Sequence, residues 1–463
     1  MSDELPQELA LNAYIGEPAR SPLDDRAARW GARTGLLAPY RALAFDDPAD
    51  PRDWASDQVG YGVLLADDPD VPHAAKAVGQ DAPEAVRELM AARPGTVMLR
   101  WSRDLAEQHV RRYFPDGSFQ DPRVGLSLFG TAKGRLPRYI VIIGTPERVP
   151  WRVQYLLAAR HAVGRLPLDD EGLGRYLSAM LDGFTAPDGG TDVDVRAPLL
   201  WTVSHPGDIT AEMRVVLADP LARALEDDRL PRFTHLHDTA ATGSGLVDAL
   251  AAQRPALLVT SSHGLAEGEH ETLRAGLGLP VDVGWHTVGL QDLDAIPPGA
   301  VWFSQACCSA GSEGASKYPG LLATGPVLDV IERVATLGPT VAPAAVALLG
   351  RERPVRAVLG HVEPTFDWTL RDERTGQGLG GQLVAALSSQ LHTGAPVGLA
   401  FKDYREGVGQ LLADWQETHD RLNAGNLGVR PQLTRLRLTA VDRQSLVLLA
   451  DPTVTLPDLA SAP

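Results

Sequence analysis

Short runs of apolar residues, bounded by proline, glycine and polar residues, recur along the chain. The clearest predict strands at 96–101, 138–144, 199–203, 233–236, 255–263, 300–307, 356–363 and 446–456. Unbroken apolar runs of this length are typical of strands buried on both faces in a parallel sheet. Between them, apolar residues at helical spacing predict helices at 82–92, 173–180, 212–225, 245–253, 327–335, 381–391 and 397–415. The alternation predicts an α/β protein with a mainly parallel sheet flanked by helices.

Two of the predicted strands end in residues that carry chemistry. The run from Pro255 ends at His263, and the run from Ala300 ends at Cys307. Ligands of open α/β sheets bind beyond the carboxyl ends of the strands. We therefore expect His263 and Cys307 at one edge of the sheet, where an imidazole and a thiol make a cysteine nucleophile with its base.

The residues around this pair resemble a known family. Gln305-Ala306-Cys307 matches the start of the caspase signature, and His263 lies 307 − 263 = 44 residues upstream, close to the roughly 50 of caspases. Gly264 follows the histidine, as in caspases, gingipains, separases and CHAT-domain proteases. The chain thus resembles the cysteine peptidases of the caspase-hemoglobinase superfamily. Its Cys308, where caspases have Arg, Gln or Gly, departs from the pattern and does not favour the caspase preference for aspartate.

Further segments resemble the gingipain-type group within that superfamily. They are the Gly-Thr-Pro turn at 144–146, Val149-Pro150, Gly164-Arg165, the exit loop 360–363 and Asp451-Pro452-Thr453. The resemblance covers about residues 135–456. It implies an N-terminal extension of uncertain structure at 1–134 and a peptidase region at 135–463, with its core at 195–456.

The chemistry of the pair assigns roles to four residues. A free thiol is mostly protonated at neutral pH, so His263 is expected to take the proton of Cys307. Gly264 has no Cβ, and its backbone N–H is a candidate donor to the oxyanion that forms on the substrate. The resemblance implies the N–H of Cys307 as the second donor. Cys308 is expected to be structural, because strand alternation turns it away from Cys307.

A substrate pocket is harder to place. Glu363, Asp367 and Trp368 follow a strand that would lie beside the cysteine strand, and with Gln305 they are the candidates to line it. An acidic residue there favours Lys or Arg before the cleaved bond. The alternative, an ordinary polar loop, stays open.

Composition narrows the partners. The 463 residues carry a net charge of −16, which argues against a nucleic-acid or anionic-membrane binder and leaves a protein or peptide as the expected partner. Any activating partner is unknown. The two cysteines are adjacent, so no disulfide framework is expected. The first six residues show no signal-peptide pattern and no apolar run reaches membrane length, which predicts a cytoplasmic protein.

Two alternatives to this assignment remain. His235, His237 and Asp238 are a weak candidate metal cluster without a clear fourth ligand, so we expect no metal and no other cofactor. A catalytically idle relative that binds partners through the same fold is the alternative to an enzyme. The intact pair of His263 and Cys307 favours a cysteine endopeptidase.

Overall fold

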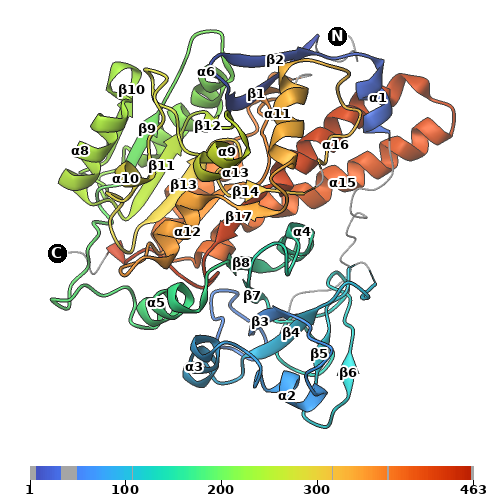
Figure 1. The fold of residues 1–463 in the computed structure, drawn as a ribbon, viewed down its shortest axis with the longest axis vertical. Helices are drawn as coiled ribbons and strands as arrows, with labels where there is room; N and C mark the ends of the chain where they lie inside the picture. The colour runs from blue at the N-terminus through green and yellow to red at the C-terminus, as the bar shows by residue number, and fades with distance from the viewer. Residues whose placement is uncertain (1–6, 33–48, 107, 315, 373–374, 460–463) are drawn as a thin grey trace.

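The computed structural model describes residues 7–32, 49–106, 108–314, 316–372 and 375–459. The first six residues, where we sought a signal peptide, lie outside this set. The described residues form a mixed α/β structure around a sheet of ten strands in the order β10-β9-β11-β13-β16-β17-β8-β7-β3-β4. The predicted fold class, a mainly parallel sheet flanked by helices, is confirmed (Figure 1).

The sheet consists of two parallel halves that run in opposite directions. The first half holds β10 (Thr234–His237), β9 (Leu199–Thr202), β11 (Leu257–Ser261), β13 (Val301–Gln305) and β16 (Ala357–His361). The second holds β17 (Leu446–Leu449), β8 (Ala162–Leu166), β7 (Tyr139–Ile143), β3 (Tyr61–Ala66) and β4 (Val97–Trp101). They meet where β16 pairs antiparallel with β17. Most of these residues are fully buried, which explains the unbroken apolar runs in the sequence.

Helices and short strands complete the fold. The α-helices are α1 (Asp25–Gly31), α2 (His73–Ala77), α3 (Glu84–Ala92), α4 (Trp151–Ala158), α5 (Asp170–Leu181), α6 (Ile209–Met213), α7 (Asp219–Leu225), α8 (Gly243–Gln253), α9 (His270–Gly276), α10 (Leu290–Leu293), α11 (Pro326–Ala335), α12 (Pro343–Gly350), α13 (Gly381–Ala385), α14 (Val397–Ala400), α15 (Lys402–Asn423) and α16 (Arg430–Gln444). The short strands are β5 (Arg112–Tyr113), β6 (Phe119–Gln120), β14 (Gly311–Ser312) and β15 (Thr340–Val341).

Each predicted strand and helix has a counterpart, and the bounds differ where capping decides them. The helix predicted at 212–225 begins three residues earlier, because the Asp208 side chain accepts the N–H of Thr210 and caps α6. It contains a π-helical turn at Arg214–Ala218 before α7. The last predicted strand, 446–456, ends at Leu449, shortly before Pro452, which has no N–H to continue a ladder.

The N-terminal part of the chain is tied to the rest in two places. β3 and β4 extend the sheet beside β7, so residues on both sides of the predicted boundary at 134 share one half of the sheet. The boundary itself stays a prediction. Separately, β1 (Glu8–Tyr14) and β2 (Pro18–Pro22) form an antiparallel hairpin, and β1 pairs with β12 (Gly264–Leu265), directly after His263 (Figure 1).

Candidate functional site

Neighbouring strands bring the predicted catalytic pair to one edge of the sheet. β11 and β13 pair in parallel up to Ser261 and Gln305. His263 and Cys307 each follow two residues beyond these paired ends. The expectation that both residues leave the sheet at the same edge therefore matches the register of the two strands.

The backbones of the two loops touch directly. A Cβ placed on Gly264 would lie 2.0 Å from the carbonyl oxygen of Cys307 and 3.1 Å from its nitrogen. No residue other than glycine fits so close an approach without moving the cysteine loop. The structure thus gathers His263, Gly264 and Cys307, the residues to which the sequence assigned base, oxyanion donor and nucleophile.

A carboxylate that the sequence did not single out pairs with the histidine. Asp208 Oδ1 lies 3.0 Å from His263 Nε2, and both side chains are almost fully buried. Burial raises the pKa of Asp208, but the bonds from His263 and Thr210 outweigh it and hold this pKa below its usual value. Asp208 therefore stays charged at neutral pH and fixes the orientation of the imidazole, as the third group of a catalytic triad does.

Aromatic rings pack against the same histidine. The Trp285 ring stacks on His205 with centroids 3.7 Å apart, and it lies 5.8 Å from His263 and 5.2 Å from Tyr14. Burial lowers the pKa of His205, which favours the neutral form of its ring. The stacked rings of His205 and Trp285 lie beside His263 and limit the movement of its ring. The sequence did not indicate this contact.

The Cys307 thiol lies against the chain that follows β16. The Thr365 N–H donates to Cys307 Sγ over 3.1 Å, and the thiol is fully buried. Burial raises the pKa of Cys307, although bonds from the backbone and hydroxyl of Thr365 lower it in part. In the conformation described, Cys307 is therefore a protonated thiol.

Cys308 is also buried, and it does not continue the strand. Its φ of 57° lies in the left-handed region, and its N–H donates to the Glu363 carbonyl over 3.1 Å. Strand alternation, the reason given for separating the two cysteines, does not apply here because β13 ends at Gln305. The structural role of Cys308 stays a prediction, now supported by its turn geometry instead.

The predicted pocket residues fall into different surroundings. Asp367 and Trp368 line an open cleft of about 560 Å³ together with Asp208. Glu363 is fully buried, and its carboxylate accepts the Glu313 N–H over 2.7 Å. Gln305 borders a separate small cavity of about 30 Å³, which Asp442 also lines.

Burial raises the pKa of several of these carboxyl groups. It raises the pKa of Glu363 to about 7, against the opposing effect of Lys317. It raises the pKa of Asp367 to about 6 and that of Asp442 to about 7. Of the candidates for a pocket charge, Asp367 faces the open cleft and Glu363 does not.

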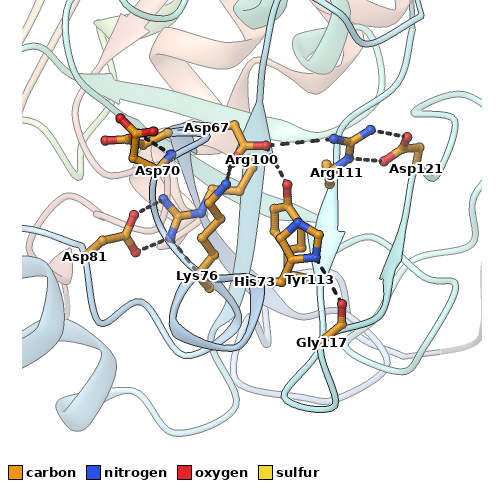
Figure 2. Close-up of polar contacts among 11 residues, drawn as sticks. Asp67, Asp70, His73, Lys76, Asp81, Arg100, Arg111, Tyr113, Gly117 and Asp121 are labelled. Carbon is orange, nitrogen blue, oxygen red and sulfur yellow. Dashed lines mark hydrogen bonds and ion pairs between the residues drawn. The ribbon is translucent and has the colours of Figure 1, made fainter.

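Two other polar groups lie away from this site. His235 bonds to Thr202 and His237 to Asp238, and the described residues contain no group of three or more His, Cys, Asp or Glu suited to a metal ion. Figure 2 shows an ion-pair network beyond β3 and β4, at the far edge of the sheet. There Lys76 lies 2.6 Å from Asp67.

This second network has a structural explanation. Arg100 forms a two-pronged bond with Asp81, and both Arg100 and Lys76 are almost fully buried. Buried cations need such partners, because an unpaired buried charge is strongly destabilising. The network of Figure 2 therefore neutralises the cations that pack beneath this edge.

One signal in the sequence would have found Asp208. It follows β9, the neighbour of β11, and it stands one residue before a helix, where aspartate is a favoured cap. Three adjacent parallel strands thus deliver Asp208, His263 and Cys307 to one edge. No comparable signal points to Trp285 or Thr365, which reach the site from irregular loops.

Comparison with known proteins adds little to this geometry. No family model matches the chain, and no curated protein matches it. One solved structure, described as "Complex of Porphyromonas gingivalis RgpB pro- and mature domains", aligns over 86% of this chain and 80% of that chain, at 11% sequence identity and a TM-score of 0.43. A likeness this distant carries no argument about activity. No helix in the described ranges is long and apolar enough to cross a membrane.

Proposed function

We propose that this protein is a cysteine endopeptidase in which Cys307 is the nucleophile and His263 the base. The observation that carries the proposal is the convergence of three groups at one sheet edge: a carboxylate 3.0 Å from an imidazole nitrogen, and a thiol on the next strand. Asp208 is a positioning residue, because it acts through His263. The resemblance in sequence to gingipain-type peptidases supports the same conclusion.

The chemistry follows from these roles. His263 takes the thiol proton, and the Cys307 sulfur attacks the carbonyl carbon of a peptide bond. The oxyanion that forms lies against the N–H groups of Cys307 and Gly264. The carbon–nitrogen bond then breaks, the leaving amine takes the proton from His263, and water releases the acyl group from the sulfur. No metal or other cofactor takes part in this sequence of steps.

The substrate is a protein or peptide, and the finer features stay proposals. A basic residue before the cleaved bond would need a carboxylate in the pocket. Asp367 borders the open cleft, whereas Glu363 is fully buried away from it, so Asp367 is the better candidate for such a charge. A reducing, cytoplasmic compartment would keep both cysteines free.

The test is a peptide-library cleavage profile with cysteine variants. Cys307→Ala should abolish cleavage while the circular dichroism spectrum and the melting temperature stay close to those of the wild type. Cys308→Ala is the matched control, and it should keep substantial activity. An inactive Cys308→Ala with an active Cys307→Ala would show that the nucleophile is assigned to the wrong cysteine.

The alternative function is a regulatory module that binds partners without catalysis. The buried contact between His263 and Asp208 argues against it, since a binding surface gains nothing from a charged carboxylate held against a hidden imidazole. Absence of cleavage for every library member, with full folding, would favour this alternative.

A further inference from the structure

The N-terminal strand β1 lies across the candidate catalytic residues. The Cys307 N–H, one of the two donors assigned to the oxyanion, donates to the Asn12 carbonyl over 3.3 Å. The Asn12 N–H donates to the Thr365 carbonyl over 3.0 Å. Two residues earlier, the Ala10 N–H donates to Asp367 Oδ1 over 3.2 Å. The backbone of β1 is therefore held at each alternate residue by the loop that borders the cysteine.

The strand is held on both sides of Asn12. Before it, Leu11 forms an antiparallel bridge with Phe366. After it, Ala13 pairs with Gly264 in a parallel ladder. The Tyr14 carbonyl then accepts the N–H of Ala266. Addition of an extended peptide to a sheet edge is a common mode of peptide recognition. Here the peptide is part of the same chain, and the edge carries the catalytic groups.

The Asn12 side chain occupies a closed pocket. It is fully buried, and neither Nδ2 nor Oδ1 has a hydrogen-bond partner among the described residues. Buried amides without partners are rare in proteins and call for an explanation. The Asn12 carbonyl lies where the carbonyl of a cleaved peptide bond would lie. The enclosed space around the Asn12 side chain would then be the pocket for the residue before the cleaved bond, which explains why a short polar residue is buried here. Since the surroundings offer no hydrogen-bond partner even to the neutral amide of Asn12, a charged side chain would be disfavoured at this position.

An aromatic contact holds β1 beyond the Asn12 carbonyl. The Tyr14 ring stacks on Trp285 at 5.2 Å, and Trp285 in turn packs near His263. The side chain two residues after Asn12 thus packs on the ring that lies beside the imidazole. With β1 in place, His263 is 1% exposed and Cys307 is not exposed at all. A substrate has no access to either group in this conformation.

The hairpin is anchored outside the catalytic groups. Ser21 Oγ accepts the Val327 N–H at the start of α11 over 3.0 Å. Ala19 is 1% exposed and packs in the same apolar cluster as Leu9 and Leu11. The cluster also includes Cys307, whereas the bond between Ser21 and Val327 involves neither His263 nor Cys307. The anchor can therefore be weakened at residues that are not themselves part of the catalytic pair.

From these contacts we propose that β1 occupies the substrate groove as a bound peptide does, with Asn12 in the place of the residue whose carbonyl is attacked. The groove accordingly takes extended peptides with a small uncharged residue at this position, and the hairpin closes it until displaced. The proposal rests on the peptidase function proposed above. For the residue before the cleaved bond of the substrate, it favours a neutral side chain over the basic one considered above.

The first experiment measures access to the thiol in the full-length protein. Ala19→Arg places a charge in the anchor and should release the hairpin, while Glu17→Arg in the exposed turn is the matched control. Iodoacetamide labelling of Cys307, followed by peptide mass spectrometry, should be at least tenfold faster in Ala19→Arg than in the wild type or the control. Equal rates in all three folded proteins would overturn the closure.

A second measurement covers the case in which Ala19→Arg does not fold. Hydrogen exchange of wild-type residues 8–22 is followed with and without the aldehyde of the peptide Leu-Ala-Leu-Asn, which copies Leu9 to Asn12. Displacement predicts faster exchange in the hairpin with the aldehyde and unchanged exchange in β3 and β4. Bound aldehyde with an unchanged hairpin would also overturn the proposal.

The specificity is tested with chloromethyl ketones of Leu-Ala-Leu-Asn and Leu-Ala-Leu-Arg on Ala19→Arg, or on the wild type if that variant does not fold. The asparagine compound should label Cys307 at least tenfold faster, and faster labelling by the arginine compound would overturn the neutral pocket. If iodoacetamide reacts rapidly with the opened protein while neither peptide compound does, the peptidase function fails although the hairpin closes the groove.

Discussion

Glu363 offers a direct test of the electrostatics that the structure describes. Its side chain is fully buried, and one carboxylate oxygen accepts the Glu313 N–H while the other has no hydrogen-bond partner among the described residues. Glu363→Gln keeps the size of the side chain and an oxygen for that bond, but it removes the titration. We therefore expect the variant to differ from the wild type mainly in how its stability depends on pH.

The magnitude follows from proton linkage. Burial raises the pKa of Glu363 from 4.5 to about 7, and a tenfold change in proton affinity corresponds to about 1.4 kcal/mol, so the full effect is about 3 kcal/mol. Below pH 4.5 both the folded and the unfolded states are protonated. Between pH 4.5 and 7 only the folded state keeps the proton, so this group makes stability fall as pH rises. Above pH 7 the loss is complete.

The assay is urea unfolding followed by tryptophan fluorescence between pH 4 and pH 8. The free energy of unfolding of Glu363→Gln, relative to the wild type, should rise by about 3 kcal/mol across this range. Asp367 and Asp442 titrate in the same range in both proteins, and the difference between the two proteins removes their contribution. Exposed Glu332→Gln is the control. Parallel pH curves for Glu363→Gln and the wild type would refute the raised pKa and the burial argument behind it.

The remaining predictions concern the catalytic groups. His263→Ala should lower kcat by a factor on the order of 10² or more, and an unchanged rate would remove His263 from the mechanism. Asp208→Asn should lower kcat by about 10² to 10⁴ with little change in KM, whereas Thr210→Val, which leaves the bond to His263, should cost far less; equal effects would reduce Asp208 to a helix cap. Chelators should leave cleavage unchanged, and loss of activity that zinc restores would instead support the His235 and His237 cluster.

The sequence by itself predicted eight of the ten strands of the sheet, all but β3 and β8, and the meeting of its two reactive residues. Buried parallel strands leave unbroken apolar runs, and the chain direction of a strand fixes which residue emerges at its carboxyl end. This local information was sufficient to place His263 and Cys307 at one edge. The missing Cβ of Gly264 suggested a backbone donor near the substrate, but its close approach to the Cys307 backbone emerged only in the structure.

Only the tertiary structure decided which groups complete the site. The bond between Asp208 and His263 depends on the order of β9, β11 and β13 in the sheet, which no local pattern encodes. It also decided that Glu363 is buried while Asp367 borders the cleft, although both follow the same strand.

The position of the N-terminal hairpin is the clearest case. Asn12 and Cys307 are almost 300 residues apart in the sequence, and their contact is made through backbone groups that every residue carries. A backbone hydrogen bond between distant segments leaves no residue-specific mark, so nothing in the sequence of residues 8–14 indicates their place over the thiol. The fold alone brings it over the thiol, because its apolar side chains are buried in one cluster with residues of α11 and α16.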